Sequence, residues 1–209
     1  MPCYAVLTGD LVDSSQVPAN HYDTLLYNLD QTLIQICDRF SGSYNIYRGD
    51  AFQLLLNQPD QALHAALLIR LSLKSAQSDA RISVGLGKVD NLRQDIKSAT
   101  GEAFTLSGKG LEQMDHLQRL KISSAASEFQ FHMELLLRFA DLLVGKTTAR
   151  QAAALHEYLS LKDNSHQQIA RRMNTSRVNV TKLLNQGHYE LLSEFIRHSQ
   201  QLSGTYFNA

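Results

Sequence analysis

The sequence has few of the residues from which secreted or metal-thiolate proteins are built. Its only cysteines, Cys3 and Cys37, have no CxxC spacing, so we expect neither a disulfide framework nor a zinc site with sulfur ligands. The eight histidines include no pair three or four residues apart, which excludes the commonest helical metal motif. Twenty basic and twenty acidic residues cancel, so the total charge predicts neither nucleic acid nor an anionic membrane as a partner. A charged binding surface must therefore be local.

Long apolar runs are absent too, since none approaches the ~18 residues that a membrane span needs. Met1 leads into the apolar residues 4–7 without a basic segment, so we expect a cytoplasmic protein with no membrane partner. The 209 residues, 44% of them hydrophobic, suffice for one core of ordinary size and a smaller second one. We expect a first domain over residues 1–125, a linker helix over 126–146 and a second domain over 147–209.

The first domain has the pattern of an α+β fold. Short apolar runs predict strands at residues 4–7, 44–47, 52–56, 81–87 and 120–123. Apolar residues at three- and four-residue steps predict helices at 22–40, after Pro59 and Asp60, and at 101–114. The order is β-α-β-β-α-β with a further helix and strand, which is the ferredoxin-like arrangement. A right-handed first crossover then places the third strand antiparallel between the first two.

Two aspartates, Asp10 and Asp50, each directly follow a glycine beside an apolar run. In the expected topology the end of the first strand lies next to the start of the third, so the two carboxylates should share one edge of the sheet. Such a pair can bind Mg²⁺ or Mn²⁺ together with a substrate phosphate, and backbone amides around Asp13, Ser14 and Ser15 can accept that phosphate. The alternative is that Asp10 caps a turn and Asp50 closes a hairpin.

The segments AVLTGDLVDSS and YRGDAFQLLL resemble the first-strand motif and the Gly-Asp-Ala hairpin of class III nucleotidyl cyclases. RISVGLGKVD and GEAFTLSGKGLEQM are similar, more loosely, to the next strand and the following helix of those enzymes. The same four blocks, in the same order over residues 4–123, more closely resemble the SatD family of small bacterial proteins. The cyclase resemblance implies a nucleotidyl cyclase-like fold in which Asp10 and Asp50 bind metal ions and Leu11 contributes a carbonyl ligand.

The chain departs from the cyclase pattern where catalysis depends on it. The resemblance places Thr105 and Lys109 at the positions of an asparagine that holds the ribose and an arginine that stabilises the transition state. Threonine lacks the forked amide, and lysine is a point charge where arginine makes planar contacts to several oxygens. Ile46 stands where adenine-specific cyclases have a lysine. Because electrostatic stabilisation of the transition state is usually the largest catalytic contribution, we expect a binding domain rather than an efficient cyclase.

The segment SHQQIARRMNTSRVNVTKLL has the spacing of a helix-turn-helix in a small all-α domain. Ser165 and Ser176 are placed to cap two helices, with a tight turn at 173–175 between them. The predicted core positions are Ile169, Ala170, Val178, Val180, Leu183 and Leu184.

The predicted DNA-binding residues are polar or basic and lie within this segment. They are Arg171, Arg172, Ser176, Arg177, Asn179, Thr181 and Lys182. Between Ser165 and His188 the chain has four arginines and lysines and no acidic residue, so its local charge of +4 suits phosphates and base edges. The alternative is a helical bundle that only packs against the first domain and leaves a solvated charged face.

The segment EFQFHMELLLRFADLLVGK predicts a long helix with apolar residues on more than one face and Gly145 as its C-cap, as is typical of a helix buried between domains or subunits. The leading hypothesis is a DNA-binding transcriptional regulator whose degenerate cyclase-like domain binds a nucleotide or divalent metal. Since helix-turn-helix proteins generally need two half-sites, we expect a homodimer. One alternative is a metal-dependent nucleotidyl cyclase or phosphoryl-transfer enzyme that uses Asp10 and Asp50. Another is a scaffold in which both sites are vestigial.

Overall fold

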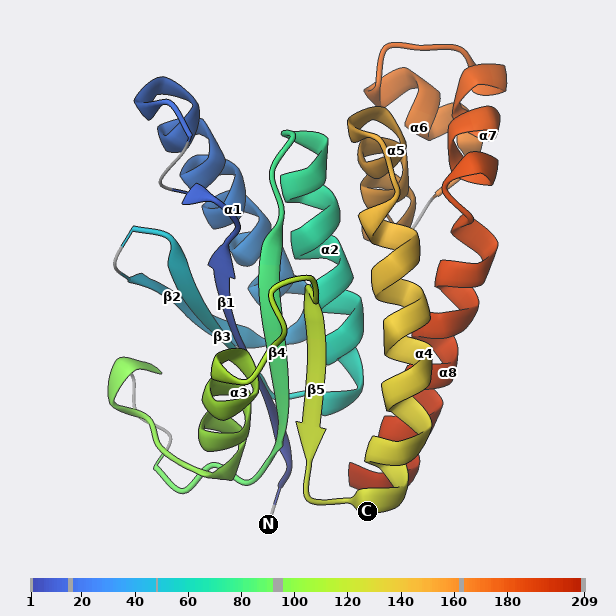
Figure 1. The fold of residues 1–209 in the computed structure, drawn as a ribbon. Helices are drawn as coiled ribbons and strands as arrows, with labels where there is room; N and C mark the ends of the chain where they lie inside the picture. Colours follow the sequence, from blue (N-terminus) through green and yellow to red (C-terminus); the bar gives the residue numbers. More distant parts are fainter. Residues whose placement is uncertain (1, 15–16, 48, 92–95, 162–163, 208–209) are drawn as a thin grey trace.

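A five-stranded sheet forms the centre of the first half of the chain (Figure 1). The structure, a computed structural model, describes residues 2–14, 17–47, 49–91, 96–161 and 164–207. The strands are β1 (Tyr4–Leu11), β2 (Gly42–Tyr47), β3 (Ala51–Leu56), β4 (Ala80–Gly87) and β5 (Leu120–Ser124). The helices of this half are α1 (Ala19–Phe40), α2 (Ala62–Ser75) and α3 (Glu102–Glu112), with short 3₁₀ turns at Pro59–Gln61 and Ile96–Ser98.

The strand order is β2-β3-β1-β4-β5, which confirms the ferredoxin-like arrangement predicted for the first four strands. β1 pairs antiparallel with both β3 and β4, and β3 pairs antiparallel with β2. The third strand therefore lies between the first two, antiparallel to both, as predicted. β5 extends the sheet by pairing parallel with β4.

The two faces of the sheet differ in chemistry because successive side chains on a strand point to opposite sides. Leu7 and Leu54 belong to the main core, which they form with apolar side chains of α1 and α2. The opposite face is more polar and is covered by α3, where the Thr8 and Ser107 hydroxyls lie 2.9 Å apart. Gly85 lets α3 approach closely, since a Cβ there would clash with the Ala103 carbonyl oxygen.

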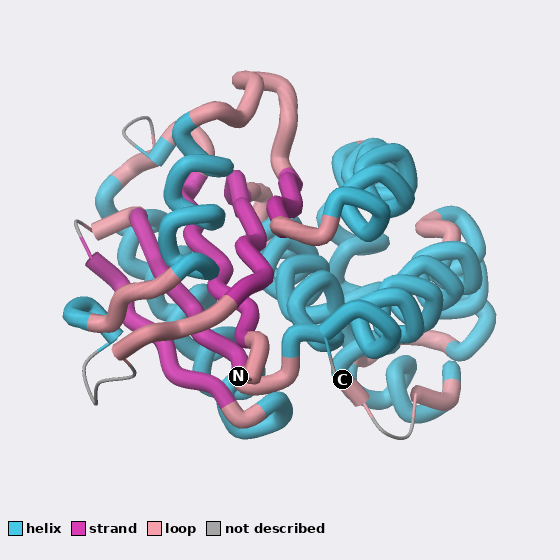
Figure 2. The backbone as a smooth tube through the Cα atoms, turned by 90° about the horizontal axis from the view of Figure 1, so that it is seen from below, coloured by secondary structure: helices cyan, strands magenta, loops and turns pink. Residues whose placement is uncertain are grey.

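Five further helices of the described ranges lie on the α2 side of the sheet, as Figure 2 shows from below. They are α4 (Ser127–Gly145), α5 (Ala149–Ser160), α6 (His166–Arg172), α7 (Arg177–Gln186) and α8 (Tyr189–Phe207). α5 packs on α2, and α4 packs between β5 and α8. Leu155 and Val180 share one continuous apolar core with Leu67 of α2. The helical half is therefore packed against the sheet domain, and the division at residues 125 and 146 stays a prediction.

Polar contacts reinforce the seam between the two halves. The carbonyl oxygen of Leu159, at the end of α5, accepts a hydrogen bond from the Arg39 guanidinium at 3.0 Å. The Nε2 atom of His64 lies 3.0 Å from the same oxygen. Burial lowers the pKa of His64 to about 4, so its ring is neutral at neutral pH and Nε2 donates to that oxygen.

The prediction that Gly145 is the C-cap of the long helix is wrong. Gly145 is the last residue of α4, and the cap is Lys146, whose backbone N–H donates to the carbonyl oxygens of Leu142 and Val144. Gly145 does not have the positive φ of a glycine cap, so the chain leaves the helix without a left-handed residue. Within the described ranges, no helix combines the length and apolarity that crossing a bilayer demands.

Candidate functional site

Asp10 lies near the end of β1, where its Cα is paired with Ala51 of β3 and Arg81 of β4. The Arg81 guanidinium donates two hydrogen bonds to the Asp10 carboxylate, from Nε to Oδ1 at 2.9 Å and from a terminal nitrogen to Oδ2 at 2.5 Å. The hydrogen bonds to Asp10 and its charge raise the pKa of Arg81. Both oxygens of the carboxylate are thus engaged by one bidentate cation.

Asp50 lies in the turn between β2 and β3, beside the end of β1. Its backbone carbonyl accepts a hydrogen bond from the Leu11 N–H at 3.0 Å, and its carboxylate accepts one from the Ser14 hydroxyl at 2.7 Å. The topology therefore brings the segments that carry Asp10 and Asp50 to one edge of the sheet, as the sequence predicts. The Leu11 side chain is buried in the main core. The roles of Asp10, Leu11 and Asp50 as metal ligands stay predictions.

At this edge the carboxylates that would hold a metal ion already have partners within the chain. Among the residues that the structure describes, no group of three or more His, Cys, Asp and Glu side chains is arranged to hold a metal. Mg²⁺ and Mn²⁺ prefer oxygen ligands with free lone pairs, but Arg81 already uses both carboxylate oxygens of Asp10. Each Asp10 oxygen keeps a second lone pair, so a divalent cation bound here would share the carboxylate with Arg81 or displace the guanidinium.

The predicted phosphate-binding residues follow β1 directly. Ser14 uses its hydroxyl to donate to Asp50, and Asp13 is exposed with a positive φ of 53°. The loop is tied down by a hydrogen bond from the Val12 N–H to the Asp79 carbonyl oxygen at 2.9 Å. Ser15 lies outside the described residues. Asp13 borders an open hollow of about 1410 Å³, but neither Asp10 nor Asp50 does, so this hollow is separate from the carboxylate pair.

Thr105 and Lys109, which the resemblance assigns to transition-state positions, lie on α3 with exposed side chains. The Thr105 hydroxyl donates to the Gly101 carbonyl oxygen at 3.2 Å, which is a local contact within the first turn of the helix. Ser107 on the same helix faces the sheet and contacts Thr8. α3 therefore covers the strand that carries Asp10, and a catalytic role for Thr105 and Lys109 stays a prediction.

The α6 and α7 helices form where the sequence predicts a helix-turn-helix. The Ser165 and Ser176 hydroxyls cap them by accepting hydrogen bonds from the N–H groups of Gln168 and Asn179. In the turn between them, Asn174 has a positive φ of 47°. The helices cross over a core formed by Ile169, Ala170, Val180 and Leu184, all buried.

The prediction that Val178 belongs to this core is wrong, since its side chain is 79% exposed. α7 begins at Arg177, and its buried positions are Val180 and Leu184, four residues apart. Val178 lies two residues before Val180, which turns it about 200° around the helix axis to the opposite side. It therefore lies between exposed Arg177 and the turn of α7 that carries exposed Lys182.

Several predicted DNA-binding side chains form contacts with other residues of this chain. Arg172 pairs with Glu157 of α5 at 2.5 Å, and the Asn179 amide donates to the Thr175 hydroxyl at 3.0 Å. The Thr181 hydroxyl lies 2.8 Å from Nδ1 of His166. Within the described part of the chain, Arg171, Arg177 and Lys182 are exposed and their side chains have no hydrogen-bond or ion-pair partner. These three cations remain available to an external anion.

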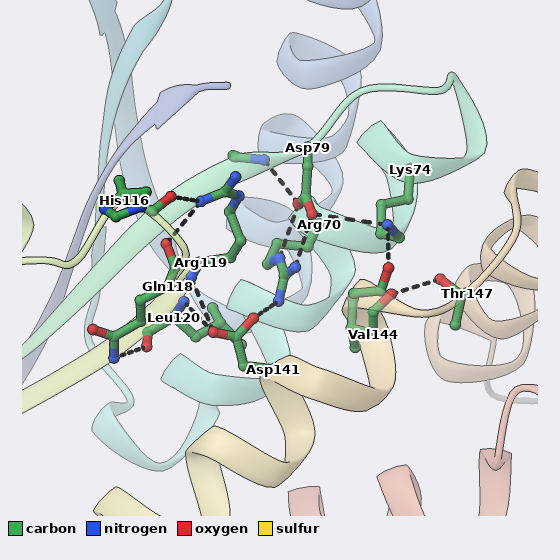
Figure 3. Close-up of polar contacts among 12 residues, drawn as sticks. Arg70, Lys74, Asp79, His116, Gln118, Arg119, Leu120, Asp141, Val144 and Thr147 are labelled. Carbon is green, nitrogen blue, oxygen red and sulfur yellow. Dashed lines mark hydrogen bonds and ion pairs between the residues drawn. The ribbon is translucent and has the colours of Figure 1, made fainter. Parts of the chain in front are cut away.

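Figure 3 shows a second set of charges, which the sequence did not predict. Arg70 of α2 is fully buried, and its guanidinium donates to both carboxylate oxygens of Asp79 and, at 2.7 Å, to Asp141 of α4. Burial alone lowers the pKa of Arg70, but the hydrogen bonds and charges of the two carboxylates outweigh that effect and raise it. Asp141 also accepts the N–H groups of Arg119 and Leu120, so this cluster joins α2, α4 and the start of β5.

Signals for these unpredicted residues exist in the sequence. Arg70 is the one charged residue in the apolar run ALHAALLIRL, and a charge at such a position needs a buried partner. Arg81 is the first residue of the run predicted as the fourth strand, and antiparallel pairing with the first strand brings that end of the run to Asp10. Register therefore predicts a cation opposite the aspartate.

Comparisons with known proteins give no family for the chain. No family model matches it, and no curated protein matches it. Among solved structures it is similar to a bacterial light-regulated adenylyl cyclase, with 16% identity and a TM-score of 0.47 over 58% of this chain and 43% of that chain. The chain therefore spans less than half the length of that structure.

Two further similar structures have comparable values. One is the guanylate cyclase domain of RhGC from Catenaria anguillulae in complex with GTP, with 17% identity and a TM-score of 0.48 over 64% of this chain and 83% of that chain. The other is the adenylyl cyclase CyaB from P. aeruginosa, with 14% identity and a TM-score of 0.46 over 64% and 81%. Structural similarity at these identities and TM-scores assigns no function to this chain. A proposed function must therefore rest on the contacts within the chain itself.

Proposed function

We propose that this chain is a DNA-binding regulator in which α6 and α7 act as a helix-turn-helix and α7 enters the major groove. The observation that carries the proposal is the outer surface of α7. Arg177, Val178 and Lys182 are exposed and border one shallow hollow on it, while Val180 and Leu184 of the same helix are buried. An exposed face of this kind on the second helix of a capped pair suits a recognition helix.

Each of these side chains has a chemistry that suits duplex DNA. The Arg177 guanidinium can donate two hydrogen bonds to a guanine edge, and the Val178 methyl groups can contact the methyl group of thymine. Lys182 offers a point charge to a backbone phosphate. Asn179 and Thr181, which the sequence assigns to base reading, hold the turn and α6 in position instead. They are positioning residues in this proposal.

The sheet domain has a sensing role in the same proposal, at the edge that carries Asp10 and Asp50, with a nucleotide or a divalent cation as ligand. Its support is the adjacency of the two segments, with Leu11 bonded to Asp50 and Ser14 bonded to the Asp50 carboxylate. Ligand binding there competes with Arg81 for Asp10. A cation bound there therefore shares the Asp10 carboxylate with the Arg81 guanidinium or displaces it.

DNA binding is tested by titrating a labelled duplex of random sequence with the full chain and following fluorescence anisotropy at several salt concentrations. The double variant Arg177→Ala, Lys182→Ala should bind more weakly, and its log-log salt slope should flatten by about 0.9 for each phosphate that is no longer neutralised. The matched control is Lys146→Ala, Arg150→Ala, which removes the same charge from exposed positions outside α7. Equal weakening in both variants, or none in either, would contradict the role of α7.

A second candidate function is metal-dependent nucleotidyl or phosphoryl transfer with Asp10 and Asp50 as ligands. The observation that favours it is again the meeting of their two segments at one sheet edge, as the cyclase resemblance requires. Incubating the chain with nucleoside triphosphates and Mn²⁺ separates the two candidates. Turnover that Asp50→Asn abolishes would favour the enzyme, whereas nucleotide binding without turnover would favour the sensor.

A further inference from the structure

The α4 helix has two apolar faces, and only one of them is buried. Phe129, Met133, Leu137, Ala140 and Val144 point into the protein at steps of three and four residues. A second series, Phe131, Leu135, Phe139 and Leu142, follows the same steps but is offset by two residues. Two residues correspond to about 200° of rotation, so the second series lies on the opposite side of the helix.

This second series is exposed to an unusual degree. Phe131 is 78% exposed, and Leu135, Phe139 and Leu142 are each more than half exposed. Single exposed apolar side chains are ordinary, but a continuous stripe along more than two turns of helix marks an interaction surface. We call these four residues the α4 stripe.

An apolar groove continues the α4 stripe. It lies between α4 and α8, has a volume of about 720 Å³, and is lined by Leu136, Phe139, Leu143, Leu191 and Phe195 among others. α4 and α8 lie side by side in Figure 1, in yellow and red, and the two helices are in contact. A ridge and a groove therefore lie next to each other on one surface of the molecule, with Phe139 and Leu142 belonging to both.

We propose that the α4 stripe and the α4–α8 groove form the interface through which two copies of this chain pair about a two-fold axis. A two-fold interface uses the same patch on both copies, so it needs a surface that is complementary to itself. The ridge of one copy can enter the groove of the other, and the reverse contact forms at the same time. Neither half of the chain provides a described segment that covers this surface.

The size of the patch agrees with a second copy as occupant. The exposed parts of the four stripe residues and of Leu191 on α8 amount to roughly 500 Å² per copy, on the basis of ordinary side-chain areas. A stable interface buries about 800 Å² per partner, which the groove lining and a polar rim can supply. The largest apolar patch on a monomer is usually about 300–600 Å², so this surface is already at the upper end before pairing.

The charges at the rim of the groove are also self-complementary. Glu194 and Arg197 lie one turn apart on α8, and both border the groove. When two α8 helices run antiparallel across a two-fold axis, Glu194 of each copy can lie opposite Arg197 of the other. The arrangement favours a second copy over an acidic or a basic partner, which would meet one of the two charges with like sign.

The pairing also meets a need of the proposed function, on which this part of the inference rests. A single helix-turn-helix binds one half-site, and two copies related by a two-fold axis bind two. α8 follows α7 after a short turn, so an interface on α8 fixes α7 relative to its copy. The α4 stripe and the groove do not include Arg177, Val178 or Lys182, so pairing leaves the outer face of α7 open.

The test is the mass of the full chain in solution, measured by sedimentation equilibrium through the micromolar range. The wild type should be dimeric, and Leu135→Glu, Phe139→Glu should raise the dimer dissociation constant by about thirtyfold or more, as expected when central interface anchors are removed. The matched control is Tyr27→Glu, Leu117→Glu, which places the same two carboxylates at exposed apolar positions elsewhere. It should leave the constant unchanged.

The outcomes separate this interface from the proposed function. A wild type that is monomeric throughout, or a dimer that the α4 variant leaves intact, would overturn the interface even if the chain binds DNA. A dimer that the α4 variant dissociates would support the interface even if no duplex is bound, in which case the DNA-binding proposal alone fails. Far-ultraviolet circular dichroism of both double variants checks that exposed substitutions leave the helices folded.

Discussion

The sheet edge at Asp10 and the outer face of α7 hold charges of comparable number but in opposite states. At the sheet edge Asp10 is paired with Arg81 and Asp50 accepts from Ser14. On α7, Arg177 and Lys182 are exposed, and the described part of the chain offers them no partner. A site whose charges satisfy one another binds a ligand only at the cost of breaking those contacts, whereas an open cationic face needs no rearrangement.

The same contrast holds for arginines buried and exposed. Arg70 has no exposure and binds two aspartates, while Arg177 reaches into solvent. The first joins secondary-structure elements and the second contributes nothing visible to the fold. Substitutions at the two kinds of site test whether this division between structural and available charge is correct, beginning with the largest expected effect.

Arg70→Met should lower the free energy of unfolding by about 3–5 kcal/mol, because it removes the buried guanidinium that Asp79 and Asp141 share and leaves Asp79 only Lys74, at 3.9 Å. Urea denaturation followed by circular dichroism measures the decrease. Arg177→Met is the matched control and should change the same quantity by no more than about 0.5 kcal/mol. Similar values for the two variants would remove the distinction between buried and exposed arginines.

Acid should weaken the seam between the two halves through His64, whose pKa burial lowers to about 4. An unfolded histidine has a pKa of about 6.5, so between this value and 4 the unfolded chain binds more protons than the folded one. The contribution of His64 to stability is therefore complete above about pH 6.5. It decreases by up to about 3 kcal/mol as the pH falls toward 4. Urea midpoints measured across this range should fall more steeply for the wild type than for His64→Gln. His156, whose pKa burial also lowers, is common to both proteins, so parallel slopes would rule out the contribution of His64.

Val178→Glu should weaken binding to duplex DNA by about tenfold or more, because it replaces the proposed base contact with a charge that the phosphates repel. The free energy of unfolding should change little, since the side chain is exposed. Anisotropy titration measures the affinity. Tyr27→Glu, at an exposed position on α1, serves as the control and should bind DNA as the wild type does.

Arg81→Gln should change the free energy of unfolding by at most about 1 kcal/mol, because the pair with Asp10 is partly exposed to solvent. It should instead release the Asp10 carboxylate and strengthen Mn²⁺ binding, measured by calorimetry. The double variant Arg81→Gln, Asp10→Asn should abolish that increase. If Mn²⁺ binds no better to Arg81→Gln than to the wild type, the sheet edge is not a metal site.

The sequence was sufficient to predict the secondary structure and the topology of the sheet, but the analysis missed the side-chain ion pairs. The order of the first four strands, the meeting of the Asp10 and Asp50 segments, and the serine caps of α6 and α7 follow from apolar periodicity and from glycine and serine positions. Those signals are local, and the topology rules extend them. They predict a sheet domain and a set of helices, but they do not establish that the chain binds a metal ion or DNA.

The contacts that the sequence analysis missed depend on long-range pairing. The Asp10–Arg81 pair joins residues 71 positions apart, as does the hydrogen bond from Arg70 to Asp141. The prediction for Val178 was wrong because Val178 and Val180 lie on different sides of α7 and cannot both face the protein core. The packing of α7 against α5 and α6 decides which of the two is buried. The α4 stripe has the same origin, since the apolar pattern alone does not show which face of the helix is covered.

Amide hydrogen exchange of the full chain with and without a random-sequence duplex tests the central claim most directly. We predict slower exchange on adding DNA in α7 and in the turn at residues 173–176, with residues 10–14 and 50–56 unchanged. Unaltered exchange throughout α7, or protection at the Asp10 edge instead, would contradict the role of α7 in DNA binding.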